Sequence, residues 1–152
     1  MISRARERNF LIVHVQTDYT KERSLWFRQF ERFHPDRTDV EMPFEPTKLR
    51  IESFASPTKS ELVIGKTGFA AGLHTNLIDY LNSRGITNVL VAGLITSVCV
   101  HHTAFTLFDA GFQTCVIQDC CADRNRRRHD SVLFLYGEYM YDVLDSSSLL
   151  LL

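Results

Sequence analysis

The sequence lacks an excess of charge of either sign. Its 152 residues include 17 Lys and Arg and 18 Asp and Glu, which gives a net charge of −1. This balance lacks the basic footprint of nucleic-acid-binding proteins, so we expect no nucleic-acid partner. The one basic run, residues 124–128, is short and interrupted by Asn125. We interpret it as a solvated loop or the start of a helix.

Long apolar runs are also missing. No segment approaches the ~20 apolar residues of a transmembrane helix, and Leu149 to Leu152 are too few to span a bilayer. Residues 2–8 are mostly polar and lead into no apolar core of a signal peptide. We therefore predict a cytoplasmic protein with no membrane partner.

Cysteine is scarce and unevenly placed. The four cysteines, Cys99, Cys115, Cys120 and Cys121, cluster late in the chain. The adjacent pair has poor geometry for a structural bridge, and no Cys-x-x-Cys pattern supports a redox protein. This usage predicts reduced thiols in a reducing compartment.

What the sequence does have is an alternation of strand and helix patterns. Its length fits one domain, residues 1–152. Apolar, β-branched runs predict strands at residues 10–16, 61–65, 88–93, 113–118 and 140–143. Helical spacing predicts helices at residues 24–33, 75–83, 98–110 and 127–136, the first with Ser24 as its N-cap. This order predicts an α/β fold with a mostly parallel sheet, in which the first strand is buried.

Polar side chains follow several of these strands. In open α/β sheets the ligand site lies at the carboxyl ends of the strands. That rule indicates three places: Lys66, residues 94–99 and Asp119.

Cys99 begins a helix after a buried strand and a short loop. At a helix N-terminus, the dipole and the backbone N–H groups stabilise a thiolate. The same N–H groups are suited to binding an oxyanion. The alternative is that Cys99 is a small buried hydrophobic residue, as most unpaired cysteines are. Its local context favours neither interpretation.

Lys66 ends a strand after Val63, Ile64 and Gly65. A lysine at this edge of the sheet lowers the pKa of a nearby thiol or stabilises developing negative charge. A solvated surface lysine is the ordinary alternative. Lys66 becomes a site candidate because it shares the predicted edge with Cys99.

Two segments together resemble the isochorismatase-like cysteine hydrolases. The first has the pattern of Lys66, Phe69, Thr75, Leu77, Leu81 and Gly85. The second is Gly93-Leu-Ile-Thr-Ser-Val-Cys-Val100, followed by Thr103, Ala104 and Gly111. Asp119 and His129 stand where that family usually has an acidic residue and a histidine. The resemblance covers roughly residues 60–135, more than half of the chain.

The resemblance implies a three-layer α/β/α fold and an Asp–Lys–Cys triad with a covalent intermediate. Carried over by position, Cys99 is the nucleophile and Lys66 is the triad lysine. A cis peptide bond would join Leu94 and Ile95, and the N–H groups of Ile95 and Cys99 would form the oxyanion hole. No cofactor is implied.

The chain departs from the family pattern at its start. The family aspartate ends a first strand that has no counterpart here, and residues 1–7 are similar to the end of the helix that follows that strand. Asp18 lies after the second strand and does not match this aspartate. The missing strand is central in the family sheet order, 3-2-1-4-5-6. We therefore expect either direct pairing of the strands that begin at Phe10 and Asn88, or an N-terminally incomplete, truncated domain.

Several further residues are candidates for the substrate pocket: Gln16, Phe69, His74, Thr96 and, less favoured than a structural role, His14. The Asp-x-His metal motif of nicotinamidases is absent after the second strand, where the sequence reads Gln16-Thr-Asp-Tyr-Thr20. We predict no metal ion.

Two functional hypotheses follow. The first is a metal-free cysteine hydrolase, in a homo-oligomer, acting on a small carbonyl, amide or vinyl-ether substrate such as isochorismate. The second is a non-catalytic family member that acts by binding or assembly, because without the family aspartate no evident base takes the proton of Cys99.

Overall fold

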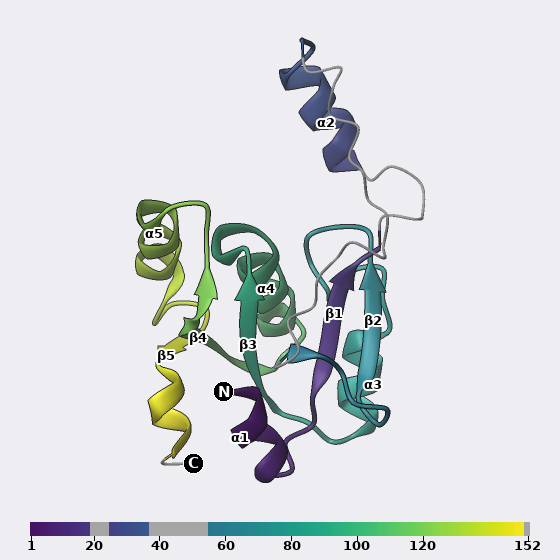
Figure 1. Ribbon diagram of the computed structural model, residues 1–152, viewed down its shortest axis with the longest axis vertical. Coiled ribbons are helices and arrows are strands. Elements are labelled where there is room, and N and C mark those ends of the chain that lie inside the picture. Colours follow the sequence, from purple (N-terminus) through teal and green to yellow (C-terminus); the bar gives the residue numbers. More distant parts are fainter. Residues whose placement is uncertain (19–24, 37–54, 151–152) are drawn as a thin grey trace. The chain divides into compact units, whose positions relative to one another are not determined.

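A computed structural model describes residues 1–18, 25–36 and 55–150 of the chain (Figure 1). The N-cap predicted at Ser24 lies outside these residues. The chain divides into two compact units, Ile2–Gly68 and Phe69–Leu152. The expectation of one domain stays a prediction. No helix of the described part has the length and apolar character needed to cross a bilayer.

The N-terminal unit contains two helices and a two-stranded parallel sheet. Its described elements are α1 (Ile2–Glu7), β1 (Val13–Thr17), α2 (Leu25–Phe33) and β2 (Leu62–Lys66). Strands β1 and β2 lie side by side (Figure 1), in a register that runs from Val13 opposite Leu62 to Thr17 opposite Lys66. Both strands therefore end at the same edge of the sheet.

The first strand begins later than the sequence predicts. Asn9 has a φ of 57° and ends α1, and the N–H of Phe10 donates to the carbonyl of Ala5 (2.9 Å). This arrangement is a helix C-terminal motif, so Phe10 belongs to the end of α1 and not to a strand. The strand is also less buried than predicted, because Val15 is 37% exposed and its other residues are of intermediate exposure.

A partly buried carboxylate joins three segments of this unit. Glu61, just before β2, accepts two hydrogen bonds from Arg6 of α1, at 2.8 and 2.9 Å. It also bonds His14 of β1 (2.9 Å) and accepts the N–H of Thr58 (2.9 Å). His14 therefore has the structural role that the sequence analysis favoured.

The C-terminal unit is built around a three-stranded parallel sheet in the order β3-β4-β5. Its elements are α3 (Leu77–Ser83), β3 (Asn88–Leu94), η3 (Thr96–Val100), α4 (His101–Asp109), β4 (Gln113–Ala122), α5 (Arg126–Tyr136), β5 (Asp142–Leu144) and η4 (Ser146–Leu150). The expected α/β fold with parallel strands is confirmed. The direct pairing of the strands near Phe10 and Asn88 is not among the ladders of the described residues.

Local sequence explains several of the element boundaries in this unit. The side chain of Asn125 accepts the N–H of Arg128 (3.0 Å) and so caps α5. Helix α3 is followed by Gly85, whose φ of 66° favours glycine. Strand β5 begins later than predicted, at Asp142, after an isolated bridge between Gly137 and Tyr141.

The register between β3 and β4 is interrupted. Val91 of β3 pairs with Val116 of β4, whereas Gly93, only two residues later in β3, pairs with Cys121, which lies five residues later in β4. Of residues 117–120, which lie between these partners, Ile117 pairs with Leu144 of β5. Gly93 has a φ of 126° at this irregularity, a conformation that side-chain-bearing residues rarely adopt. As a result β4 extends to Ala122, beyond the predicted end of the strand.

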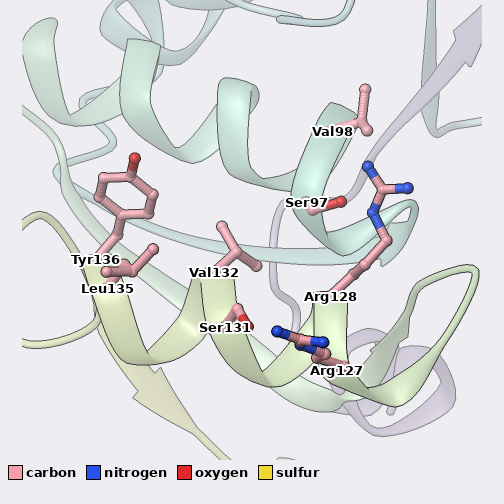
Figure 2. Close-up of a pocket in the computed structure, with 8 residues that line it drawn as sticks. All are labelled: Ser97, Val98, Arg127, Arg128, Ser131, Val132, Leu135 and Tyr136. Carbon is pink, nitrogen blue, oxygen red and sulfur yellow. The ribbon is translucent and has the colours of Figure 1, made fainter.

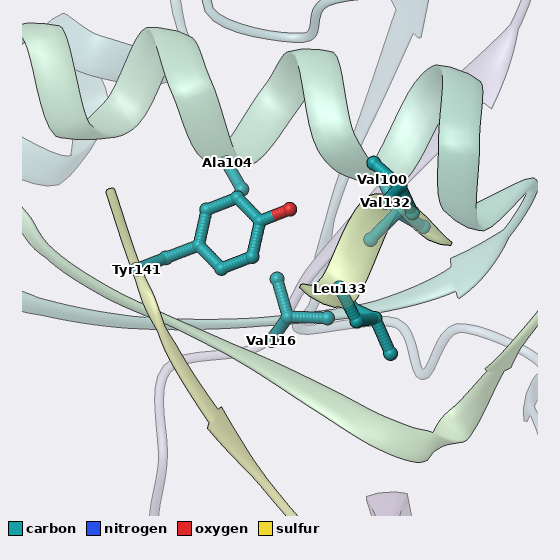
Figure 3. Packing of buried hydrophobic residues seen from close by; sticks show 6 residues of the cluster. All are labelled: Val100, Ala104, Val116, Val132, Leu133 and Tyr141. Carbon is teal, nitrogen blue, oxygen red and sulfur yellow. The ribbon is translucent and has the colours of Figure 1, made fainter. Parts of the chain in front are cut away.

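The core of this unit lies between the sheet and helices α4 and α5. Figure 3 shows six side chains that converge there from η3, α4, the sheet and α5: Val100, Ala104, Val116, Val132, Leu133 and Tyr141. Val116 and Ala104 are fully buried. Burial raises the pKa of Tyr141 to about 12, with smaller contributions from Tyr136 and Cys121.

We predict that Leu133→Ala destabilises the protein by about 2–5 kcal/mol, because it removes a buried side chain and leaves a cavity. The adjacent Phe134 is 86% exposed, against 8% for Leu133. Phe134→Ala is therefore a matched control and is expected to change the free energy of unfolding by less than about 0.5 kcal/mol. Urea denaturation measures both, and equal effects would contradict the described packing.

The contacts of Glu61 with Arg6, His14 and Thr58 predict that the stability of the protein depends on pH. Hydrogen bonds from Arg6 and Thr58 outweigh burial and lower the pKa of Glu61 well below its ordinary value of 4.5. A carboxyl whose pKa is depressed on folding stabilises the protein above its unfolded-state pKa, and this contribution is lost as the pH falls through the folded-state pKa. We expect Glu61→Gln to be less stable than wild type at pH 7, with the difference narrowing below pH 4.5.

Thermal melts between pH 7 and pH 3 measure this difference. Glu7→Gln, at an exposed position of α1, serves as the control and should melt like wild type throughout. A gap between wild type and Glu61→Gln that widens on acidification would show that the carboxylate of Glu61 does not stabilise the fold.

Candidate active site

The segment between β3 and α4 forms a tight turn around Cys99. Strand β3 ends at Leu94, and the peptide bond between Leu94 and Ile95 is cis, at the position where the family resemblance implies one. The carbonyl of Ile95 accepts the N–H groups of Val98 (3.0 Å) and Val100 (3.2 Å). Residues 96–100 are therefore a π-helical turn, and we call residues 95–99 the Cys99 turn.

Cys99 is partly buried within this turn. The sequence predicted one helix over residues 98–110, but the structure has the π turn first and then α4 from His101. The difference arises because the carbonyl of Ile95 also reaches Val100, five residues on. Cys99 thus lies inside the wide first turn, near the amino end of the continuous helical segment.

Three consecutive residues before Cys99 are each bound by a side chain from another element. The hydroxyl of Thr96 hydrogen-bonds Nδ1 of His129 on α5 (2.9 Å). The N–H of Ser97 donates to Oδ2 of Asp123 after β4 (2.7 Å). The carbonyl of Val98 accepts a hydrogen bond from Nδ1 of His102 on α4 (2.7 Å). The Cys99 turn is therefore fixed from three sides.

Asp123 is the anionic member of this group. Partial burial alone would raise its pKa, but hydrogen bonds from Ser97 and Arg124, together with the charge of Arg128, lower it. The Ser97 hydroxyl contributes to this lowering although it makes no hydrogen bond of good geometry within the described residues. Asp123 is therefore a carboxylate at neutral pH.

The sequence predicts Asp119 directly after a strand, but the structure has it inside one. Asp119 lies within β4, and its carboxylate accepts the N–H (2.8 Å) and the hydroxyl (2.6 Å) of Ser146 at the start of η4. These two hydrogen bonds lower the pKa of Asp119. Because β4 continues to Ala122, the residue that follows its carboxyl end is Asp123. A strand prediction extended to Ala122 would have identified it.

Lys66 lies in the N-terminal unit, at the carboxyl end of β2. Its ammonium donates to the carbonyl of Gly68 (2.8 Å) and to the hydroxyl of Thr17 (3.3 Å), and the side chain is buried. The N–H of Asp18 donates to the backbone carbonyl of Lys66 (2.7 Å). The predicted pocket residue Gln16 pairs with Gly65 one position earlier.

Of the other predicted pocket residues, two lie near the Cys99 turn. Thr96 is buried within it, and the ring of Phe69 lies 5.7 Å from that of His102, centroid to centroid. His74 is exposed and has a φ of 58°. The intervening segment is anchored on α4, because the N–H of Ala71 donates to the hydroxyl of Thr103 (3.0 Å).

A shallow pocket of about 330 Å³ lies beside the Cys99 turn (Figure 2). It is lined by η3 and α5, with Ser97, Val98, Arg127, Arg128, Ser131, Val132, Leu135 and Tyr136. Figure 2 shows the side chain of Arg128 reaching from α5 toward Ser97 and Val98. Two guanidinium groups and three hydroxyls, next to apolar side chains, suit a small anionic molecule.

The other three cysteines are less suited to act as nucleophiles. Burial raises the pKa of Cys115 and of Cys121 to about 11, and that of Cys120 is also raised. These thiols are therefore poor nucleophiles at neutral pH.

Among the residues that the structure describes, no group of three or more His, Cys, Asp or Glu is placed to bind a metal ion.

Comparison with known proteins agrees with this arrangement. Residues 1–148 match the Isochorismatase domain family. The chain belongs to the isochorismatase family. The isochorismatase-like hydrolase from Alkaliphilus metalliredigens has the same fold, with a TM-score of 0.80 and 20% identity over 99% of this chain and 79% of that one.

Two curated isochorismatase-family relatives are amide hydrolases by name. Maleamate amidohydrolase of Pseudomonas putida is 28% identical over 138 residues, which is 88% of this chain and 62% of that protein. N-carbamoylsarcosine amidase of Arthrobacter is 28% identical over 105 residues, 69% of this chain and 37% of that protein. The chain thus spans less than two thirds of the length of either relative.

The contacts of Asp119 predict a structural role. Asp119→Ala removes both acceptors of Ser146, so we expect faster amide hydrogen exchange at residues 146–150, measured by mass spectrometry. Iodoacetamide labelling of Cys99 should not change. Asp145→Ala, at the exposed acidic residue that precedes Ser146, is the matched control. Slower labelling of Cys99 in Asp119→Ala would instead place Asp119 in the active site.

Proposed function

We propose that this protein is a cysteine hydrolase that cleaves a small amide substrate, with Cys99 as the nucleophile. The observation that carries the proposal is the conformation of the Cys99 turn. It places a partly buried thiol in the first turn of a helical segment, directly after a strand of a parallel sheet. Backbone N–H groups near the amino end of a helical segment are suited to binding the oxyanion that forms when a carbonyl is attacked.

The backbone of the turn also limits where an oxyanion can bind. The N–H groups of Ser97, Val98 and Val100 already donate to Asp123 and to Ile95. The family resemblance implies an oxyanion hole formed by the N–H groups of Ile95 and Cys99, and we propose the same assignment here.

In the proposed reaction, Sγ of Cys99 attacks the amide carbonyl carbon and the C–N bond of the tetrahedral intermediate breaks. The thiol proton leaves with the amine, and a thioester remains. Water then attacks the thioester carbon, and the carboxylic acid and the thiol are released. Lys66 is proposed as the triad lysine that stabilises negative charge during these steps.

The pocket beside the turn supports an anionic substrate. Arg127 and Arg128 line it together with Ser97, and maleamate and N-carbamoylsarcosine, from which the two relatives are named, both carry a carboxylate. We propose a small amide with a carboxylate group as the substrate class. Isochorismate, with two carboxylates, is kept in the same test.

The alternative is a non-catalytic family member. In this chain Asp18 is the acidic residue that follows β1 and neighbours Lys66, and it does not match the family aspartate. If no group takes the proton of Cys99, the turn would bind a carbonyl compound without cleaving it. The same measurements separate the two functions.

We predict that the protein hydrolyses at least one member of a panel of maleamate, N-carbamoylsarcosine, nicotinamide and isochorismate. Cys99→Ser should lower kcat/KM by more than about a thousandfold, because the hydroxyl is a far weaker nucleophile. Maleamide, the uncharged analogue of maleamate, should be cleaved more slowly than maleamate. Release of ammonia or of product is the measurement.

Cys120→Ala is the control, since it removes a thiol with a raised pKa away from the turn. It should retain full activity. Hydrolysis that survives in Cys99→Ser would overturn the cysteine mechanism. Saturable binding of maleamate to wild type without any turnover would favour the non-catalytic function.

A further inference from the structure

The Cys99 turn is fixed by an unusual set of side chains. Thr96, Ser97 and Val98 are consecutive, and each hydrogen-bonds a titratable side chain from a different element: His129, Asp123 and His102. The three bonds are 2.7–2.9 Å long. None of the three side chains belongs to the triad that the family resemblance implies.

These contacts act on different groups of the turn. Asp123 binds a backbone N–H, His102 binds a backbone carbonyl, and His129 binds the hydroxyl of a buried threonine. Only the bond from Asp123 combines a full charge with a backbone group two residues before Cys99. Hydrogen bonds to ionised groups are roughly twice as strong as neutral ones.

We propose that Asp123 is a positioning residue that fixes the Cys99 turn through the N–H of Ser97, with His129 and His102 supporting the turn at Thr96 and Val98. This inference rests on the proposed role of Cys99 as the nucleophile. The orientation of Ser97 determines the direction of the backbone that leads to Cys99, two residues later. A misplacement of about 1 Å at such a site costs up to about a hundredfold in rate.

Positioning and simple electrostatics predict opposite effects for the loss of Asp123. As a nearby anion, its carboxylate disfavours a thiolate at Cys99, so removal of the charge alone would make the thiol react at lower pH. As a positioning group, it keeps the turn in the conformation that stabilises the thiolate, so removal of the acceptor would make the thiol react at higher pH.

The surroundings contain several other charged or titratable groups. Arg124 and Arg128 act on Asp123 itself, the first through its backbone N–H and the second through its charge. His102 donates to the turn, and His101 beside it has a pKa lowered by burial and by His102. The pH profiles of all variants are therefore compared with that of wild type under identical salt.

The experiment measures iodoacetamide labelling of Cys99 against pH, with each cysteine peptide quantified by mass spectrometry. In Asp123→Ala we expect about tenfold slower labelling of Cys99 at pH 7. The pH of half-maximal rate should rise by about one unit. Asp123→Asn keeps an acceptor oxygen for the N–H of Ser97 and should label within about twofold of wild type.

Asp130→Asn, a substitution on α5, is the matched control. Asp130 is exposed and pairs with Arg126 on the surface of α5, at 2.7 Å, so its profile should equal that of wild type. Cys115 reports on folding, because its thiol is buried. General unfolding in any variant would speed its labelling, whereas loss of positioning slows Cys99 alone.

Thr96→Val provides a second route, since it removes the hydroxyl that bonds His129. It should slow labelling of Cys99 at pH 7 in the same direction as Asp123→Ala. If Asp123→Ala unfolds, the labelling profiles of Asp123→Asn and Thr96→Val decide whether the turn is positioned by these side chains. A downward shift of the profile in Asp123→Ala, or wild-type rates in both Asp123→Ala and Thr96→Val, would overturn the proposal.

The outcome is independent of the proposed hydrolysis. Labelling measures the thiol directly and needs no substrate. If Cys99→Ser retains hydrolysis, the proposed function fails while the labelling result stands. If Cys99→Ser is inactive and the profiles of the Asp123 variants match that of wild type, only the positioning role fails.

Discussion

The carbonyl of Ile95 accepts two N–H groups, from Val98 and Val100, and the candidate active site depends on this arrangement. It widens the first turn of the helical segment and places Cys99 inside it. The sheet and helices around the turn serve to keep that geometry. Strand β3 delivers Ile95, while α4, α5 and the end of β4 each supply one side chain that binds the turn. The core of Val100, Val116 and Val132 lies directly beneath.

Much of this could be predicted from the sequence. The alternation of apolar runs and helical spacing gave the α/β fold, because burial on both faces of a parallel strand leaves a continuous apolar pattern. Strand β3 begins at Asn88 as predicted, and α3 ends at Ser83. The motif around Cys99 identified the family through the spacing of Gly93, Thr96 and Cys99.

Other features could not be predicted from local sequence patterns. The start of β1 was placed too early because Phe10 is apolar, although its N–H completes the end of α1. The end of β4 was placed too early because the apolar pattern stops before the irregularity, after which Cys121 and Ala122 pair again with β3. That error made Asp119 appear to be a site residue and hid Asp123. The contacts of His102 and His129 with the turn depend on tertiary packing that spacing along the chain does not encode.

The irregular register of β4 limits the changes in length that this segment tolerates. Side chains alternate between the two faces of a strand, so the loss of one residue between Ile117 and Cys121 would turn every later position to the opposite face. Asp123 would then point away from Ser97. The length of this short segment is as constrained as the identity of the residues in it.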